Sequence, residues 1–427
     1  MFYIVLQLLE WNLIVKGEEK MKQIIGGVTA AKGFFASAAK AGIKYKDRLD
    51  MAMIFSKEPC NVAGTFTKNI VKAAPVKWDQ NIVKKSEAVH AVIVNAGIAN
   101  ACTGVEGMEY CNETALHTAK HFSISEDSIL VASTGVIGMQ LPMEKIKSGI
   151  DTLVKSMGES IEDGHQASLA IMTTDTHEKE IAVEIELSGK KVVVGGMCKG
   201  SGMIHPDMCT MLSFVTTDAN ISKELLQEAL SEDVDDTYNM ISVDGDTSTN
   251  DTCLLLANGL AKNKKITVKD EDYIKFKEAL NVVNTTLAKE MAGDGEGATA
   301  LFEVKVVHAK DKQQAKILSK AVITSNLTKA AIFGHDANWG RILCAMGYSG
   351  AEFDPEKVDL YFESKAGKIK IIENSVALAY SEKEATHILS EPVVTATADI
   401  KMGEAQATAW GCDLSYDYIK INADYRS

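Results

Sequence analysis

Closely spaced pairs of strand-like segments set the strongest limit on how this chain can fold. Residues 181–187 and 191–196 flank "SGK", and residues 361–363 and 368–372 flank "SKAG". Both arrangements predict β-hairpins, whose strands run antiparallel. Segments of helical spacing alternate with further strand-like segments along the rest of the chain. The pattern therefore predicts a mixed α/β class rich in hairpins, and it disfavours a simple doubly wound parallel sheet.

The remaining elements follow from apolar periodicity. Strands are expected at 88–95, 128–132, 301–308 and 393–400, and helices at 108–121, 142–157, 223–230 and 271–291, with a further helix ending over 386–390. The chain has six prolines, no repeat and no proline-rich linker. Composition therefore marks no domain boundary within the 427 residues, a length that suits two or three ordinary domains or one large one.

Charge and cysteine content limit the partners of the protein. The net charge of −13 disfavours nucleic acid and anionic membranes, because both need a basic surface. Eight cysteines occur without a C-x-x-C pair, which predicts free thiols in a reducing cytoplasm. The apolar stretch 1–15 carries Gln7 and Glu10 and is too short to span a bilayer. We expect residues 1–20 to be an extension outside a fold that begins at Met21.

Two motifs that suggest metal binding fall short of their consensus. His117 and His121 lie four residues apart on a predicted helix, but no glutamate follows His117 and no third ligand is nearby in the sequence. Solvated helix histidines are therefore the expected interpretation. The segment 244–252, "DGDTSTNDT", resembles a calcium loop, but Thr249 stands where such a loop needs glycine. The sequence therefore predicts no metal site.

The stretch 199–219, "KGSGMIHPDMCTMLSFVTTDA", combines a glycine loop, the pair Cys209-Thr210 and an apolar run. A threonine hydroxyl is a weak nucleophile unless a base lies beside it, and cleavage before Thr210 would free its own α-amine as that base. Such an amine has a pKa of about 7.7–8.0, so part of it is neutral at physiological pH. From the residues alone, the stretch fits both a self-cleaving nucleophile and an ordinary loop that enters a core element.

Several blocks in a fixed order resemble the ornithine acetyltransferase family, also called glutamate N-acetyltransferase, from Met21 to Ser427. Besides 199–219 they are "GGVTAAKGFFASAAKAGIK", "AGTFTKNIVKAAPVKW", "VNAGIANACTG", "ASTGVIGMQLP", "IMTTDT", "VDGDTSTNDT", "GDGEGAT", "IFGHDANWGRILCAMGYSG" and "INADYRS". The resemblance implies a layered αββα sandwich of α+β class, laid out like N-terminal nucleophile hydrolases but with different topology. It also implies cleavage into an alpha chain, 21–209, and a beta chain, 210–427.

The chain departs from the family pattern at a few positions. Cys209 replaces the usual alanine or glycine before the nucleophile, and Ala96 and Ile98 alter the block "NAGIANA". The segment "GHDANWGR" differs from the usual Gly-Arg-Asp-Pro that precedes Asn-Trp-Gly-Arg. None of these changes removes a residue that the mechanism needs, and cysteine keeps the small size that a tight scissile bond requires.

The resemblance also assigns roles to individual residues. Thr210 matches the nucleophile, which first attacks the carbonyl of Cys209, and Thr134 and Gly135 match the oxyanion-hole pair. The substrate-binding positions are Thr173, Lys199, Thr210, Glu296, Asn422 and Ser427. Without the resemblance, Lys199 and Glu296 fit a solvated loop lysine and a surface acid, and Thr134-Gly135 fit a strand-to-loop turn.

The implied reaction moves acetyl from N2-acetyl-L-ornithine to L-glutamate in arginine biosynthesis, without a cofactor and with acetyl-CoA as a further candidate donor. The expected assembly is a cytoplasmic heterotetramer of two alpha and two beta chains, with small-molecule amino-acid substrates and neither nucleic acid nor a membrane as partner. An amidohydrolase or aminopeptidase with the same cleaved nucleophile is the alternative enzyme, and a binding protein with an uncut loop is the non-catalytic one.

Overall fold

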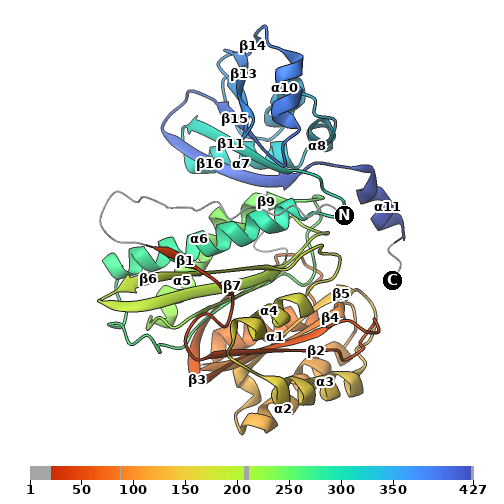
Figure 1. The fold of residues 1–427 in the computed structure, drawn as a ribbon, viewed down its shortest axis with the longest axis vertical. Coiled ribbons are helices and arrows are strands. Elements are labelled where there is room, and N and C mark those ends of the chain that lie inside the picture. The colour runs from red at the N-terminus through yellow and green to blue at the C-terminus, as the bar shows by residue number, and fades with distance from the viewer. Residues whose placement is uncertain (1–20, 87, 206–210, 425–427) are drawn as a thin grey trace.

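The structure is a computed structural model that describes residues 21–86, 88–205 and 211–424. Figure 1 shows a large lower sandwich of sheets and helices and a smaller upper domain formed mainly by the cyan and blue chain from residue 301 onward. The sandwich strands are β1 (Lys22–Ile24), β2 (Phe34–Ala39), β3 (Met51–Phe66), β4 (Val89–Ile98), β5 (Ile129–Val136), β6 (Lys179–Leu187), β7 (Lys190–Lys199), β8 (Leu212–Thr217) and β10 (Thr252–Ala257). Its helices are α1 (Ala74–Lys85), α2 (Glu106–Phe122), α3 (Met143–Ser156), α4 (Ile161–Ala170), α5 (Lys223–Asp236) and α6 (Glu271–Gly293).

Strand β3 links the two layers of the sandwich. Its first half pairs with β2 and β4, whereas residues 61–66 pair with β10. The register shifts between Phe55 and Cys60, and Pro59 lies in this irregular, exposed stretch. A proline is tolerated there because it has no N–H to give to a ladder. The sandwich strands thus form one hydrogen-bonded path, β1-β6-β7-β8-β10-β3-β4-β5 with β2 beside β3, that folds into two layers.

Alternation along the strands separates the interior of the sandwich from its outer faces. In β8, Leu212 and Phe214 join the cluster shared by both layers, whereas Val215 packs toward the helices outside. Strand β4 divides in the same way, with Val92 inside and Ile93 outside. Successive side chains of a strand point to opposite faces of the sheet, and here the side chains on both faces are apolar and buried. Both faces of each sheet are therefore apolar and need a covering layer.

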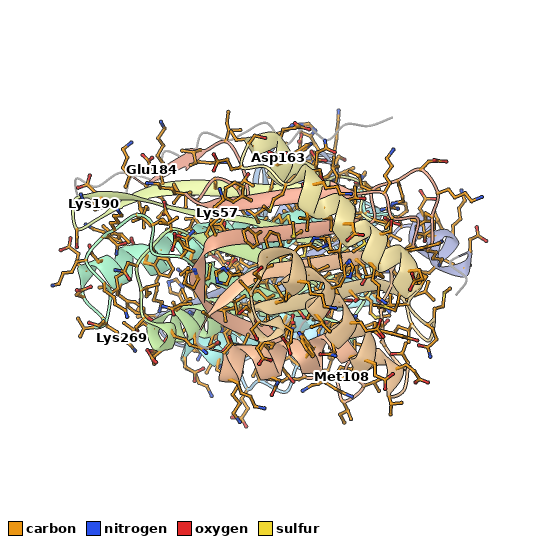
Figure 2. The ribbon with its side chains drawn as sticks, turned by 90° about the horizontal axis from the view of Figure 1, so that it is seen from below. Lys57, Met108, Asp163, Glu184, Lys190 and Lys269 are labelled. Carbon is orange, nitrogen blue, oxygen red and sulfur yellow. The ribbon has the colours of Figure 1, made fainter. Side chains whose placement is uncertain are left out.

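Helices cover the two outer faces of the sandwich. Helices α5 and α6 pack on the layer that contains β6, β7 and β8, and α2 and α3 pack on the layer that contains β4 and β5. Figure 2 views the molecule from below, from the side on which α2 and α3 lie in Figure 1, and labels Met108 of α2. The order is helix, sheet, sheet, helix, which confirms the predicted αββα sandwich of α+β class.

The upper domain is a second sheet with the order β14-β13-β12-β15-β11-β16-β9. Its strands are β9 (Ile241–Ser242), β11 (Leu301–Ala309), β12 (Asp359–Ser364), β13 (Gly367–Glu373), β14 (Val376–Ala377), β15 (Val393–Asp399) and β16 (Ala405–Cys412). Helices α7 (Lys312–Ile323), α8 (Asn326–Phe333), α9 (Trp339–Gly347) and α10 (Glu382–Leu389) accompany it, and α11 (Tyr416–Asp424) ends the described chain. Among the described residues, α11 buries no side chain.

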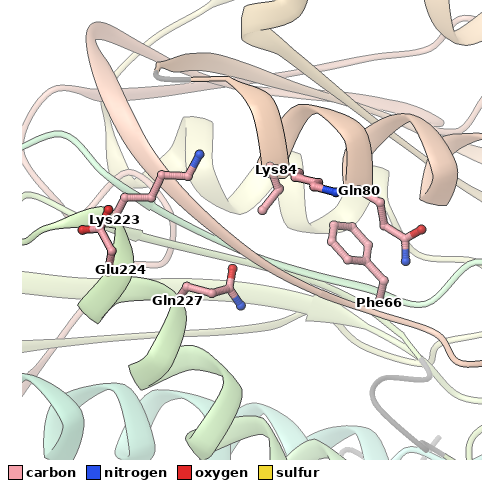
Figure 3. Close-up of a pocket in the computed structure, with 7 residues that line it drawn as sticks. Phe66, Gln80, Lys84, Lys223, Glu224 and Gln227 are labelled. Atoms are coloured by element: carbon pink, nitrogen blue, oxygen red, sulfur yellow. The ribbon is translucent and has the colours of Figure 1, made fainter.

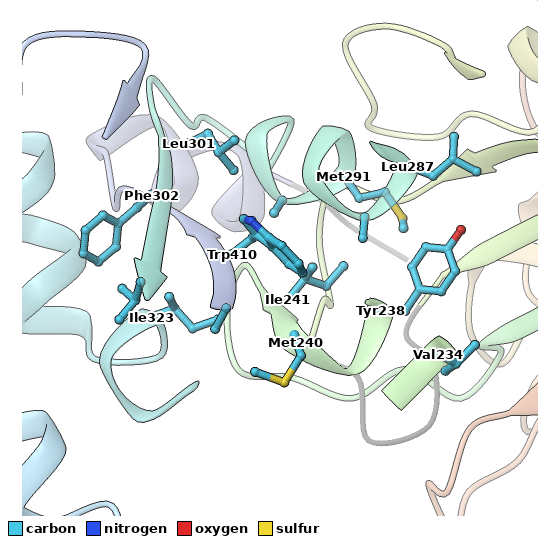
Figure 4. Close-up of a cluster of buried hydrophobic side chains, with 14 of the residues drawn as sticks. Val234, Tyr238, Met240, Ile241, Leu287, Met291, Leu301, Phe302, Ile323 and Trp410 are labelled. Carbon is cyan, nitrogen blue, oxygen red and sulfur yellow. The ribbon is translucent and has the colours of Figure 1, made fainter. Parts of the chain in front are cut away.

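One apolar cluster runs without interruption from the sandwich into the upper domain. Tyr238 and Met291 lie on the sandwich side, and Phe302 and Ile323 lie on the upper side. Figure 4 shows Trp410 and Ile241 between them, and these two residues are register partners in β16 and β9. Because the core is continuous, no flexible linker is needed, which explains why composition marked no boundary.

Most sequence-predicted elements occur where expected. Strands β6 and β7 form the predicted hairpin, and Ser188 and Gly189 at its turn have φ values of 49° and 71°, as a tight hairpin turn requires. Strands β12 and β13 form the second predicted hairpin. Over the described residues, no helix is both long and apolar enough to cross a membrane. Residues 1–20, the predicted extension, lie outside the described residues.

Candidate active site

Six predicted site residues that are distant in the sequence line one cavity of about 160 Å³. They come from strand ends, loops and the C-terminal helix of the described chain, and they are Thr134, Gly135, Thr173, Lys199, Glu296 and Asn422. Met211 and Leu212 also line this cavity. Cys209, Thr210 and Ser427 lie outside the described residues, so their predicted roles stay predictions.

The register of β7 and β8 brings the two ends of the glycine loop together. Lys199, the last residue of β7, pairs with Leu212, the first residue of β8. Strand β8 is buried at every position, antiparallel to β7 and parallel to β10. The loop that carries the predicted cleavage bond therefore begins and ends at one edge of a rigid central sheet, beside the cavity.

Acceptors on Asp175, Asp244 and Asp294 hold the first half of that loop. The N–H of Gly200 donates to Oδ1 of Asp175 at 2.7 Å, and the hydroxyl of Ser201 donates to the carbonyl oxygen of Asp294 at 2.6 Å. The N–H groups of Met203 and Ile204 donate to the two carboxylate oxygens of Asp244 at 2.6 and 2.9 Å. Asp244 belongs to the segment that resembles a calcium loop, and here its carboxylate binds backbone instead.

The end of β5 presents the predicted oxyanion-hole pair to the cavity. Gly135 has a φ of 125°, and a Cβ there would lie 2.2 Å from the carbonyl carbon of Gly97 in the neighbouring strand β4. Only glycine fits, because the two strands approach too closely for a side chain. Asn250 fixes this strand end by donating to the carbonyl oxygens of Ser133 and Ala99, at 2.8 and 2.5 Å.

Asn250 is a cavity residue that sequence reasoning did not single out. Its side chain is buried and accepts a hydrogen bond from the hydroxyl of Thr249 at 2.6 Å. The block "TSTNDT" stood out only as part of the calcium-like segment and of the family resemblance. A polar run directly before the apolar strand β10 was the available signal, since buried polar side chains need such partners.

Beneath Lys199 lies a row of four alternating buried charges. The Lys199 ammonium is 3.7 Å from Asp175, Lys179 is 3.0 Å from Asp175, and Lys179 is 2.6 Å from Asp294. The side chains of Lys179 and Asp175 are fully buried. Burial acts to raise the pKa of Asp175, but Lys199, Lys179 and two backbone N–H groups outweigh it and hold that pKa well below its usual range.

The same row keeps Lys179 charged. Burial acts to lower its pKa, but Asp175 and Asp294 reverse this effect and raise the pKa above its usual value. At 3.7 Å the contact of Lys199 with Asp175 exceeds hydrogen-bond length. The Lys199 ammonium therefore has protons to offer to an anion in the cavity, while Asp175 holds its position.

Glu296 is a buried acid, so its interpretation as a surface acid is wrong. It is 9% exposed, its N–H donates to the carbonyl oxygen of Ser201 at 3.0 Å, and Asn422 donates to its carboxylate at 2.7 Å. A Cβ on Gly202 would lie 2.5 Å from the Glu296 carboxyl carbon. Gly202 therefore makes the room that lets this carboxylate lie against the loop, and Asn422 ties α11 to the cavity.

A second depression lies on the surface between α1 and α5, shown in Figure 3. None of the predicted site residues lines it. The polar ends of its residues bind the protein itself, since Lys223 donates to the carbonyl oxygen of Ser86 at 2.7 Å and Gln227 exchanges hydrogen bonds with the backbone of Gly64. The chemistry of the described chain is therefore concentrated in the cavity beside Lys199.

Comparison with known proteins identifies the family of the chain. Residues 35–427 match the ArgJ family. The chain belongs to the ArgJ family. It is 49% identical over 407 residues to the arginine biosynthesis bifunctional protein ArgJ of Caldanaerobacter subterraneus, an alignment that covers 95% of this chain and 100% of the relative. It is 51% identical over 400 residues to ArgJ 1 of Clostridium acetobutylicum, covering 94% and 97%.

Among solved structures, an ArgJ protein of Bacillus halodurans is 46% identical and covers 50% of this chain and 98% of its own, with a TM-score of 0.48. An ornithine acetyltransferase of Mycobacterium tuberculosis complexed with ornithine is 38% identical, covering 45% and 100%, with a TM-score of 0.42. Membership in the ArgJ family confirms the resemblance expected from the sequence. The chain is an acetyltransferase of arginine biosynthesis that acts on small molecules.

Proposed function

We propose that the protein transfers acetyl from N2-acetyl-L-ornithine to L-glutamate through an acetyl ester on Thr210. The observation that carries this proposal is the single cavity that collects a buried cation, Lys199, a buried anion, Glu296, and the strand end at Thr134-Gly135. Met211, the residue after the proposed nucleophile, lines the same cavity. An acyl donor with both a carboxylate and an ammonium group matches these charges.

Self-cleavage prepares the nucleophile in this proposal. The Thr210 hydroxyl attacks the carbonyl carbon of Cys209, the peptide C–N bond breaks, and an ester forms while the nitrogen takes up a proton. Water then hydrolyses the ester, which leaves the carboxylate of Cys209 and a free α-amine on Thr210. This step would divide the chain after residue 209, into an alpha chain whose fold covers residues 21–209 and a beta chain of residues 210–427. The hydrogen bonds that hold Gly200, Ser201 and Ile204 support it, because they fix the described part of the loop that leads toward the proposed cleavage bond.

Acetyl transfer then follows in two halves. The Thr210 α-amine accepts the hydroxyl proton as the oxygen attacks the acetyl carbonyl, and the proton passes to the departing amine of ornithine. Thr134 and the N–H of Gly135 would stabilise the negative oxygen of each tetrahedral intermediate, a donor effect of about 2.7–4 kcal/mol. The α-amine of glutamate attacks the acetyl ester in reverse order and releases N-acetylglutamate.

The charged ends of the cavity would set substrate orientation. Lys199 pairs with the α-carboxylate that both substrates share, and Glu296 accepts the side-chain ammonium of ornithine. Asn422 holds the Glu296 carboxylate at 2.7 Å and so keeps it directed. Thr173 and Ser427 are the other proposed binding residues. The proposed reaction uses only protein groups and calls for no resident cofactor. Because the relatives are named bifunctional, we also propose acetyl-CoA as a second acetyl donor.

The proposed assembly is a cytoplasmic heterotetramer of two alpha and two beta chains. Helix α11 supports an interface between subunits, because it exposes Tyr416 and Ile419 at 82% and 66%. The seven cysteines of the described chain are all free thiols, which suits a reducing compartment. Size-exclusion chromatography with light scattering tests the assembly.

A denaturing gel and one assay test the proposal. Two bands of roughly half of 46.2 kDa are expected, and Thr210→Ala should leave one intact, inactive band. Acetylornithine with glutamate should give N-acetylglutamate, whereas acetate release at the same rate without glutamate would instead identify an amidohydrolase. An intact wild-type chain without transferase activity would refute the proposal in favour of a binding protein.

A further inference from the structure

Three metal-binding side chains converge on the outer helical layer of the sandwich. His117 and His121 lie four residues apart in α2, and Asp151 comes from the neighbouring helix α3. The Nε2 atoms of both imidazoles are 2.8 Å from the same oxygen, Oδ1 of Asp151. The three candidate ligand atoms all lie within 4.8 Å of one another. The third ligand that the sequence lacked near the histidines is thus supplied by another helix.

The chain topology explains why these groups meet. Strands β4 and β5 are parallel, and α2 connects them before β5 leads toward α3. The two helices therefore lie side by side on one sheet face, and they run in the same direction. One turn earlier, Lys147 of α3 binds Glu113 of α2 at 2.9 Å, which fixes the same helix register. That pairing also neutralises Lys147, which lies four residues before Asp151 in α3.

The site is accessible and nearly the right size for an ion. The side chains of His117, His121 and Asp151 are 28%, 33% and 44% exposed, so an ion and a water can reach them. Zinc binds imidazole nitrogen at about 2.0–2.1 Å and carboxylate oxygen at about 2.0–2.2 Å, which places tetrahedral ligand atoms about 3.3 Å apart. Each imidazole nitrogen needs to move about 0.5 Å away from the Asp151 oxygen, from 2.8 Å to about 3.3 Å, which rotation of partly exposed side chains allows.

We propose that His117, His121 and Asp151 form a binding site for a divalent transition metal of the zinc type, with water completing the coordination. Two imidazoles and one carboxylate favour zinc, nickel or cobalt over magnesium or calcium, which prefer oxygen ligands alone. On binding, each imidazole presents its Nε2 lone pair and keeps its proton on Nδ1. The ion replaces two hydrogen bonds by three coordination bonds and clamps α2 to α3.

The proposed ion is a structural clamp, separate from the chemistry of the cavity. None of its three ligands lines that cavity. The clamp nevertheless acts on the helices that precede and follow β5, the strand that carries Thr134 and Gly135. Zinc should therefore raise the melting temperature of the protein, because a ligand that binds only the folded state stabilises it.

Calorimetric titration of the full-length, EDTA-treated protein with zinc chloride tests the proposal. We compare the wild type with His121→Gln and Asp151→Asn, and we use His387→Gln as the control because His387 is an exposed helix histidine outside the cluster. Exposed thiols such as Cys102 also bind zinc, but the three variants leave them unchanged, so a difference among variants isolates the site. Circular dichroism without metal establishes that each variant is folded.

The expected result is one zinc per chain at this site, with affinity at least about tenfold weaker in His121→Gln and Asp151→Asn and unchanged in His387→Gln. Zinc should raise the melting temperature of the wild type and of the control, but not of the two site variants. Equal zinc affinity in all four proteins, or no saturable binding in the wild type, would overturn the proposal. The contacts of the two histidines with Asp151 would then be hydrogen bonds between helices and nothing more.

Discussion

Replacing Lys179 by methionine tests the buried charge row beneath the cavity. The Lys179 side chain is fully buried and lies 3.0 Å from Asp175 and 2.6 Å from Asp294. Methionine fills a similar volume but leaves Asp294 without its lysine and Asp175 with Lys199 alone at 3.7 Å. The variant therefore leaves two buried carboxylates, which are 0% and 3% exposed, without the positive charge that compensates them.

Removing one partner of a buried ion pair costs about 3–5 kcal/mol, mainly because the remaining charge has lost its compensation. An unfolding entropy of about 2.1 cal/mol/K per residue over 427 residues gives about 0.9 kcal/mol/K. The expected fall in melting temperature is therefore about 3–6 °C. The control is Lys191→Met in the adjacent strand, because Lys191 is 78% exposed and its 2.9 Å pair with Glu184 is worth about 1 kcal/mol at most.

The pH dependence of the melting temperature identifies the mechanism. In the wild type, the depressed pKa of Asp175 contributes stability above the unfolded value of about 3.9, and this stability is lost as pH falls below it. In Lys179→Met the pKa of Asp175 rises toward its unfolded value, so Asp175 contributes less stability at neutral pH and the melting temperature falls less on acidification than in the wild type. Scanning calorimetry between about pH 2 and pH 8 covers this window and measures both effects.

The outcome of a double variant decides the argument. Lys179→Met with Asp294→Asn removes one charge of each sign, so it should recover part of the loss of the single variant. Equal melting temperatures for Lys179→Met and Lys191→Met, or no recovery in the double variant, would refute the reasoning that an uncompensated buried charge causes the loss.

Three further variants test the cavity and the N-terminus. Gly135→Ala should lower kcat by at least about a hundredfold, because its Cβ would lie 2.2 Å from Gly97 and displace the strand that carries the oxyanion hole. Steady-state kinetics of the folded variant measure kcat, and a normal kcat would contradict the prediction. Glu296→Gln should lower kcat/KM about tenfold to a hundredfold for acetylornithine and less for acetylglutamate in the reverse direction, whereas equal losses would place Glu296 at the shared end of the substrates. A chain that begins at Met21 should cleave and turn over normally, and a large loss of activity or melting temperature would show that residues 1–20 belong to the fold.

Local patterns were sufficient to predict the elements, because hairpins and amphipathic helices depend on residues close in sequence. The hairpin of β6 and β7 follows from apolar segments around Ser188-Gly189, and both turn residues adopt the positive φ that this turn needs. The upper domain was not anticipated as a separate unit. Its sheet is joined to the sandwich by α6 and a continuous apolar core, and neither leaves a mark in composition.

The buried charges show where sequence reasoning fails in physical terms. Lys179 lies in "TTDTHEKE", a polar run typical of a solvated turn. Only the pairing of Lys179 with Cys198 in the β6–β7 ladder, together with the layer formed by α6, places its ammonium inside. Burial depends on residues more than a hundred positions away, such as Asp294, so no local pattern can report it.

The glycine loop shows how one motif serves two purposes that the sequence does not separate. Glycines near a cleavage bond suggest a tight turn, yet Gly202 is absent from the positive-φ residues of the described chain. Its requirement is space, because a Cβ there would lie 2.5 Å from the carboxyl carbon of Glu296. The loop that leads to Thr210 and the acid proposed to bind ornithine are therefore packed against each other without an intervening side chain. A substitution at Gly202 would disturb both the approach to the nucleophile and the position of that acid, so the "KGSG" and "GDGEG" blocks act as one structural unit although 90 residues of sequence, roughly, separate them.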